Sequence, residues 1–238
     1  MSAAILIAIS FSLGFFVESI IGFGGGLIAY SILVFFLDFK EMILTGFYIG
    51  TISSAYILCT DHKSFDKKTF KSAIPLSIIG TIFGAFLFAK LSPEILSLIF
   101  GILLTVLAIK IMFFDSFIFP KIFKQKLIFI GGIAQGAFGI GGPFWANALK
   151  NDFQNKSAFR ATMAALFVTF NLIRFVQLFL QDQLRLEFFI NIWWTIIPVF
   201  IAIKLGHLVH LKISENLFKK GIAIMTIFAG LKFLSKAL

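Results

Sequence analysis

Two clusters of glycine stand inside apolar stretches of the sequence, and the spacing of the first cluster returns in the second. The clusters are Gly22, Gly24, Gly25 and Gly26, and then Gly139, Gly141 and Gly142 followed by Pro143. Glycine adopts positive φ angles freely and so allows a helix to stop, and proline suits the first position of a new helix. We predict that each stretch is a helix that breaks at its glycines and restarts beyond them, from Leu27 and from Phe144 onward.

A helix that restarts inside a membrane has backbone N–H groups without partners and the positive end of its dipole at one point. Such an end binds anions, and broken helices in transporters are used in this way. Non-helical backbone at membrane depth occurs only where it is buried in protein or lines a wet cavity. The two clusters therefore predict an anion site formed by both breaks, although small residues in membranes also serve close helix packing alone.

Polar side chains near the breaks are further candidates for contact with the anion. They are Gln135, Asn147, Asn171 and Arg174. Glu18 lies one helical turn before the first break, where Gln135 stands in the second, and a carboxyl there could carry a proton with the anion. A charge at the bilayer centre costs roughly 2.5–3.5 kcal/mol, so Glu18 and Arg174 should face a cavity or each other. Two simpler roles stay open: packing for Glu18 and snorkelling to the interface for Arg174.

The composition places these residues in a lipid bilayer. Hydrophobic residues make up 59% of the chain and charged residues 13%, whereas soluble domains carry about 25% charge. Apolar runs of 18 or more residues are long enough to cross about 30 Å of hydrocarbon. The eight apolar segments lie at 4–37, 41–60, 72–90, 94–114, 127–149, 157–180, 187–205 and 216–235. We expect an all-α integral membrane protein of the prokaryotic cell (inner) membrane.

The eight segments divide into two repeats of four. The spacing Gly14-x7-Gly22 returns as Gly131-x7-Gly139, 117 residues later. This predicts one membrane domain, composed of an N-terminal repeat at 1–114, a basic connecting loop at 115–126 and a C-terminal repeat at 127–238. If segments one and five enter and leave on the same side, the halves are inverted, and fourteen Lys or Arg share one face against five on the other. The positive-inside rule favours this arrangement over one in which all eight segments span.

The net charge of +10 does not indicate a nucleic-acid partner, because the basic residues lie in short loops between apolar segments and follow the pattern of topology signals. Cys59 is the single cysteine, which excludes a disulfide framework and a thiol metal site. The sequence has no phosphate-binding loop of the G-x4-GK[ST] type and no catalytic constellation in its apolar segments. We expect no cofactor, no enzymatic activity, and the bilayer and a small anion as partners; a homo-oligomer stays open.

Three motifs together resemble the TauE/SafE family of membrane transporters. They are Gly22-Phe23-Gly24-Gly25-Gly26, Gly136-x2-Gly139-Ile140-Gly141-Gly142-Pro143-Phe144, and Phe159-Arg160-Ala161-Thr162 followed by Asn171-x2-Arg174. The resemblance covers essentially the whole chain and implies a secondary transporter of small anions such as sulfite, thiosulfate or organosulfonates. One departure is that Gln135 and Asn147 stand where strict symmetry would place Glu18 and Tyr30. A metal or other cation transporter and an intramembrane enzyme are the alternatives.

Overall fold

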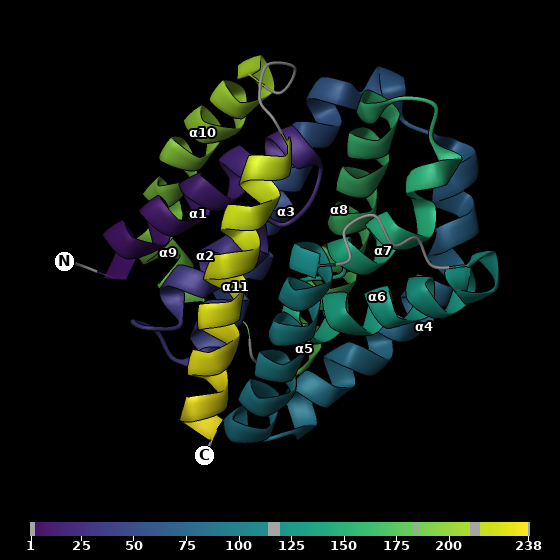
Figure 1. Ribbon diagram of the computed structural model, residues 1–238. Helices are drawn as coiled ribbons and strands as arrows, with labels where there is room; N and C mark the ends of the chain where they lie inside the picture. Colours follow the sequence, from purple (N-terminus) through teal and green to yellow (C-terminus); the bar gives the residue numbers. More distant parts are fainter. Residues whose placement is uncertain (1–2, 114–119, 183, 185, 210–214, 238) are drawn as a thin grey trace.

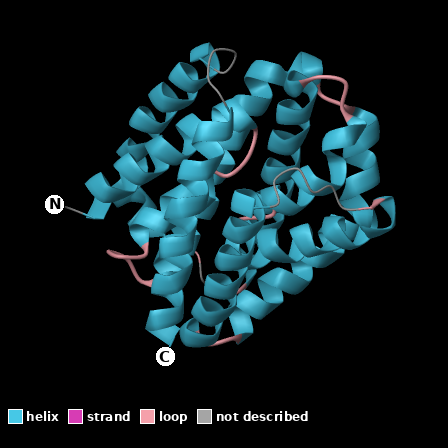
Figure 2. Ribbon diagram, in the orientation of Figure 1, coloured by secondary structure: helices cyan, strands magenta, loops and turns pink. Residues whose placement is uncertain are grey.

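The computed structural model describes residues 3–113, 120–182, 184, 186–209 and 215–237. Within these ranges the regular structure is helical throughout, with no strand (Figure 2). The start of the predicted connecting loop, 115–119, and residues 210–214 before the last segment lie outside the described part of the chain. The all-α fold class is therefore confirmed for the residues that the structure describes.

The helices follow the predicted apolar segments along the chain (Figure 1). The first half contains α1 (Ala3–Ile21), α2 (Gly25–Leu33), α3 (Phe39–Asp61), the 3₁₀ turn η1 (His62–Ser64), α4 (Lys67–Lys90) and α5 (Pro93–Phe113). The second half contains η2 (Lys121–Phe123), α6 (Lys124–Phe138), α7 (Gly142–Leu149), η3 (Lys150–Asp152), α8 (Lys156–Leu180), α9 (Leu186–Ile192), η4 (Trp193–Thr195), α10 (Ile196–Val209) and α11 (Glu215–Ala237).

Six helical segments in the described part are long and apolar enough to cross a membrane. They are Ala3–Ile21, Phe39–Ser64, Lys67–Lys90, Pro93–Phe113, Lys156–Leu180 and Ile190–Leu208. The fifth predicted segment is not among them, because its break divides it into helices of 15 and 8 residues. Large apolar side chains such as Ile79, Phe86 and Phe228 are more than half exposed, which suits a surface covered by lipid rather than water.

The first break lies between α1 and α2. Gly22 and Gly24 have φ angles of 95° and 98°, a region that residues other than glycine rarely adopt. The turn brings α2 back against α1, since a side chain on Gly14 would collide with the carbonyl oxygen of Gly25. Helix α2 begins at Gly25, two residues earlier than the sequence suggested.

The second break, between α6 and α7, is built in a similar way. Gly139 ends α6 with a φ angle of 72°, and its N–H donates to the carbonyl oxygen of Gln135 at 2.9 Å, as in a left-handed helix cap. Helix α7 begins at Gly142 with Pro143 in its first turn. A side chain on Gly141 would meet the carbonyl oxygen of Gly131 at 2.5 Å, so the backbones of this turn are also in close contact.

Helices at matching positions of the two predicted repeats pack against each other in opposite directions. The end of α3 meets the start of α8, where Asp61 pairs with Arg160. Tyr48, nearer the start of α3, packs against Phe175 with ring centroids 5.0 Å apart. Helices α5 and α11 likewise cross in opposite directions at Gly101 and Gly230. Figure 1 shows α11 lying alongside α5.

Two further helix pairs bury one more face of each broken segment. Gly80 and Gly84 of α4 rest on the backbone of α6, and Gly132 and Gly136 of α6 rest on the backbone of α4. Helix α1 packs along α10, where Gly206 lies against Phe16 and Ser19. Small residues let these helices approach closely, as is usual in membranes, and hold both breaks inside the protein.

Candidate functional site

The two breaks meet in the interior of the protein. A β-carbon added to Gly26 would lie 3.6 Å from the carbonyl oxygen of Gly139 and 3.7 Å from a methyl group of Ile140. A pocket of about 30 Å³, the central pocket, lies at this junction. Its walls are Glu18, Gly24, Gly26, Leu27, Tyr30, Gly46, Gly50, Ser54, Gln135, Gly139, Ile140, Gly142, Pro143, Phe167 and Asn171. The structure therefore brings residues of both glycine clusters to one place.

Glu18 and Gln135 each hold the start of the helix that follows a break. The N–H of Gly25 donates to Glu18 Oε2 at 2.7 Å, and the N–H of Gly141 donates to Gln135 Oε1 at 2.9 Å. Both side chains are buried. The Nε2 group of Gln135 in turn donates to Asn171 Oδ1 at 2.7 Å, which connects the second break to α8.

The central pocket combines helix starts, amide groups and one carboxyl. The first N–H groups of a helix have no partner within that helix, so the starts of α2 and α7 direct partial positive charge toward the pocket. The space of about 30 Å³ exceeds the roughly 10–15 Å³ that one water molecule requires. In this conformation the pocket suits a water molecule or a very small solute.

Small residues of α3 form a wall of the central pocket that the sequence reading did not single out. Gly46, Gly50 and Ser54 follow one another at intervals of four residues and face the breaks. A β-carbon on Gly46 would collide with the Tyr30 hydroxyl group, so the tyrosine enters the pocket only because position 46 is glycine. The signal was present in the sequence, because small residues four apart mark a close-packing helix face.

Besides Arg174, four of the predicted site residues lie apart from the pocket walls. Gly22 packs against the ring of Phe159. Gly25 and Gly141 do not line the pocket, and their N–H groups donate to Glu18 and Gln135. Asn147 Nδ2 donates to the carbonyl oxygen of Pro143 at 2.7 Å and lines a second cavity. Tyr30, its counterpart in the first half, lines the central pocket, so the two halves differ at this position.

Arg174 also lies outside the lining of the central pocket, and its side chain is fully buried. Its Nη1 group donates to Gln177 Oε1 at 2.5 Å and to the Ala85 carbonyl oxygen at 3.3 Å. The guanidinium carbon is 4.3 Å from the centre of the Phe88 ring and 5.3 Å from that of Phe47. The side chain therefore does not snorkel to the membrane surface.

The chain matches the family described as Sulfite exporter TauE/SafE over residues 6–233. It belongs to the TauE/SafE family. No curated protein and no solved structure matches the chain at a significant level, so the assignment rests on the family match, which covers nearly every residue. The resemblance of the glycine motifs to this family is thereby confirmed, and with it the integral membrane location.

This TauE/SafE protein has a larger cavity beside the central pocket, the basic vestibule, with a volume of about 380 Å³. Cationic side chains of Lys110, Lys150, Lys156 and Arg160 line it, together with the amides of Asn147, Gln154 and Asn155. Phe23 and Pro143 form part of its wall, and Pro143 also lines the central pocket. The vestibule thus ends at the two glycine turns.

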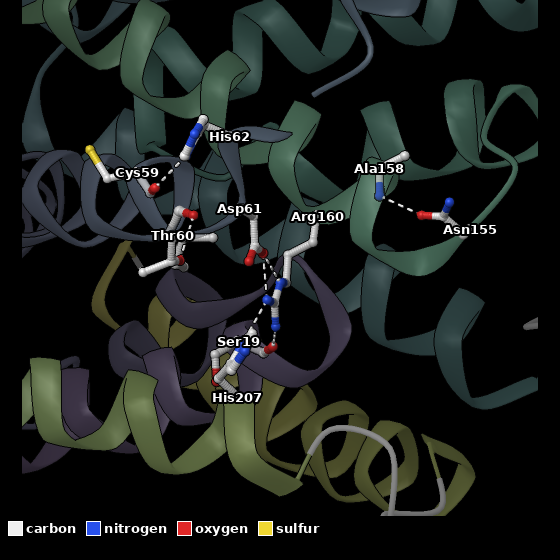
Figure 3. A network of polar contacts seen from close by, with 10 residues as sticks. Ser19, Cys59, Thr60, Asp61, His62, Asn155, Ala158, Arg160 and His207 are labelled. Carbon is white, nitrogen blue, oxygen red and sulfur yellow. Dashed lines mark hydrogen bonds and ion pairs between the residues drawn. The ribbon is translucent and has the colours of Figure 1, made fainter. Parts of the chain in front are cut away.

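Arg160 connects four helices of the TauE/SafE protein at this end of the molecule (Figure 3). Its Nε group donates to Asp61 Oδ2 of α3 at 2.6 Å, and its Nη1 group donates to the Ser19 carbonyl oxygen of α1 at 2.7 Å. Its Nη2 group lies 2.6 Å from His207 Nδ1 of α10. The sequence reading placed Arg160 in a family motif only; its buried ion pair depends on the antiparallel contact of α3 and α8.

Proposed function

We propose that the chain is a secondary transporter of small anions, such as sulfite, thiosulfate or organosulfonates, in the prokaryotic cell (inner) membrane. Membership in the TauE/SafE family, a transporter family, supports transport over catalysis. On this proposal the chain needs no cofactor, and the driving force is an ion gradient or the gradient of the substrate itself.

The observation that carries the proposal is the convergence of two helix starts on the central pocket. Gly26 belongs to the first turn of α2 and Gly142 to the first turn of α7, and both line the pocket. N–H groups and dipoles of two helices directed at one point favour a bound anion. We propose that the anion binds between the two half-helices when the pocket widens, with Gln135 and Asn171 as additional hydrogen-bond partners.

The arrangement of the helices supports two inverted repeats, at 1–114 and 127–238, with each first segment re-entrant. Helices α3 and α8 are equivalent in the two repeats, as are α5 and α11, and the partners of each pair run in opposite directions. A two-fold axis that relates antiparallel partners lies perpendicular to them and therefore in the membrane plane. Inverted repeats of this kind place the substrate near the bilayer midplane.

Glu18 would couple the anion to a proton. Its carboxyl accepts the N–H of Gly25 and lines the same pocket as the proposed anion, so a carboxylate there would repel a second negative charge. A proton on Glu18 removes this repulsion. We propose that Glu18 binds a proton when the anion enters and releases it when the anion leaves.

The basic vestibule would collect anions on one side of the membrane. Its cationic lining raises the local concentration of small anions. The part of its wall formed by Phe23 and Pro143 belongs to the two glycine turns. The vestibule lies beside segment 150–160, which the positive-inside rule assigns to the cytoplasmic face. We therefore propose that it is the cytoplasmic entrance to the central pocket.

The experiment that tests the proposal is transport by the purified full chain in proteoliposomes. The panel contains sulfite, thiosulfate, methanesulfonate, acetate and divalent metal ions, each with and without a pH gradient. We expect movement of at least one sulfur oxyanion or sulfonate and none of the metal ions. Movement of a metal ion alone would instead favour the cation transporter, for which Glu18 is the one carboxyl in the lining of the central pocket.

A further inference from the structure

We propose that Arg174 forms a second anion station, on the side of the central pocket away from the basic vestibule. The Phe47 ring separates this station from the central pocket. This inference rests on the proposed anion transport and adds a residue that selects the substrate by its charge. Along α8, Arg160 lines the vestibule, Asn171 lines the central pocket, and Arg174 follows one turn later. At 1.5 Å per residue, Arg174 lies about 5 Å beyond Asn171 along the helix axis.

The burial of Arg174 is the anomaly that points to a ligand. Its side chain is 0% exposed, and its contacts within the described part of the chain are with a carbonyl oxygen, an amide and two aromatic rings, not with a carboxylate. Buried charges in proteins are normally paired, and cationic side chains inside membranes typically line ion or substrate paths. Two aromatic rings, Phe88 and Phe47, compensate only part of the lost hydration.

The guanidinium keeps two groups available for an anion. Nη1 is used by Gln177 and the Ala85 carbonyl oxygen, but Nε and Nη2 are buried and have no hydrogen-bond partner among the described residues. These two groups lie on one edge of the planar guanidinium, the edge that binds two oxygens of one oxyanion. The ligand class is therefore a planar or tetrahedral oxyanion with two oxygens to offer.

Polar side chains connect this station to the end of α8. Asn171, Arg174, Gln177 and Gln181 follow at intervals of three, three and four residues, which places them along one face of the helix. Gln177 Nε2 donates to the Ala85 carbonyl oxygen at 3.0 Å and to Gln181 Oε1 at 3.3 Å. Gln181 is exposed at the end of the helix. The row leads from the central pocket to the surface opposite the vestibule.

Phe47 is placed to close this path. Its ring is 1% exposed and touches both sides of the boundary: a β-carbon on Gly139 would lie 3.7 Å from it, and the Arg174 guanidinium carbon lies 5.3 Å from its centre. A rotation of this ring would expose Nε and Nη2 to an anion in the central pocket. The anion would then exchange its helix N–H partners for a full positive charge.

A full charge discriminates between anions in a way that packing does not. Arg174 should stabilise a dianion such as thiosulfate more than a monoanion such as methanesulfonate, because the attraction scales with the product of the charges. The test is transport of both anions, below saturation, by the full chain in proteoliposomes. The variants are Arg174→Gln and Arg174→Lys, with Lys124→Gln as the control, since Lys124 forms a surface pair with Asp152 and lines neither the basic vestibule nor the central pocket.

Arg174→Gln should lower thiosulfate transport about tenfold or more, the effect of losing a hydrogen bond to a charged group, and methanesulfonate transport less. Arg174→Lys should restore part of the preference for thiosulfate, because the charge returns without the two-pronged geometry. If Arg174→Gln does not insert, a lysine variant that keeps the full wild-type preference overturns the station. An equal loss of both anions, or no loss, also overturns it. Failure of the wild type to move any anion refutes the proposed function itself.

Discussion

Glu18 and Gln135 stand at matching positions of the proposed repeats, and each accepts a hydrogen bond from a backbone N–H just after a glycine break. The bond lengths are 2.7 Å at Gly25 and 2.9 Å at Gly141. Both side chains thus fix the turn that follows, and only one of them can carry a charge. The hydrogen bond to the turn is therefore a structural role that both residues share, whereas proton exchange is open to Glu18 and not to Gln135.

Glu18→Gln should leave the fold intact and abolish the dependence of anion transport on a pH gradient. The amide oxygen of glutamine can accept the N–H of Gly25 as Gln135 already does at Gly141, but it cannot exchange a proton. The measurement is anion uptake into proteoliposomes at a fixed internal pH and several external pH values. Gln135→Glu is the reciprocal variant, which should weaken anion binding. Unchanged pH dependence in Glu18→Gln would reduce Glu18 to a structural role.

A methyl group added to the central pocket should block the anion without harming the fold. Gly26→Ala and Gly50→Ala are the suitable variants, because in each case the new carbon has no neighbour closer than 3.4 Å and both residues line the pocket. Overpacking a tight site costs about 1–3 kcal/mol, so binding of sulfite or thiosulfate to the purified protein should weaken about fivefold or more. Ser31→Ala, on α2 but outside the pocket lining, is the control and should bind normally.

Larger changes at the breaks test the fold together with the pocket. A β-carbon on Gly25 would lie 2.7 Å from Glu18 Oε2, and one on Gly142 would lie 2.9 Å from both Phe23 and Phe167. Gly25→Val and Gly142→Val should therefore abolish binding together with a large loss of thermal stability in detergent. Normal anion binding in both valine variants would refute the proposed site.

The buried ion pair between Asp61 and Arg160 should matter far more to stability than the exposed pair between Lys124 and Asp152. Removal of one partner of a buried pair leaves a charge without compensation and costs about 3–5 kcal/mol, whereas exposed pairs contribute about 0–1 kcal/mol. Arg160→Gln should thus lower the unfolding temperature in detergent markedly, and Lys124→Gln hardly at all. Equal effects would show that Arg160 does not hold the four helices together.

Asp66 caps the start of α4 and should make that helix sensitive to acid. Its carboxylate accepts hydrogen bonds from the Thr69 hydroxyl group and from the N–H groups of Thr69 and Lys68, which lower its pKa, the Thr69 hydroxyl most strongly. Because the folded pKa lies below the unfolded value, this stabilisation is complete above the unfolded pKa of about 3.9. It is lost as the pH falls through the folded pKa.

The check is thermal unfolding of wild type and Asp66→Asn in detergent between about pH 6 and about pH 3, around the ordinary Asp pKa. Asparagine can cap the helix but does not titrate, so the wild-type advantage should shrink toward acid pH. Asp66→Ala should lose about 1 kcal/mol at neutral pH, the usual worth of a helix cap. A wild-type advantage that does not change with pH would exclude the carboxylate as the source.

Membrane topology follows from the proposed inverted repeats. Cysteines introduced at Lys68 and Lys156 in a Cys59→Ser background should react from the cytoplasmic side, and cysteines at Lys40 and Lys90 from the outside. Tags at both chain ends should report the outside. Reaction of position 156 from the outside, with position 124 reacting from the cytoplasm, would contradict the re-entrant fifth segment.

The sequence by itself determined the features that local chemistry dictates. Apolar run lengths predict membrane helices because the thickness of the bilayer is constant, and the glycine clusters predict the breaks because positive φ angles require glycine. The structure has those angles at Gly22, Gly24 and Gly139. The family also followed from the sequence, since its motifs lie on these same turns.

Only the tertiary structure decided which polar side chains share the central pocket. Asn171 and Arg174 lie one turn apart on α8 and carry the same sequence signal, yet Asn171 lines the pocket and Arg174 lies against Phe47 and Phe88. Asn171 meets Gln135 of α6 and Gly50 of α3, whereas Arg174 meets Phe47 of α3 and Phe88 of α4, and all of these are distant in sequence. A helix repeats about every 3.6 residues, so periodicity assigns a side chain to a face, but the neighbouring helices decide what that face meets at each depth.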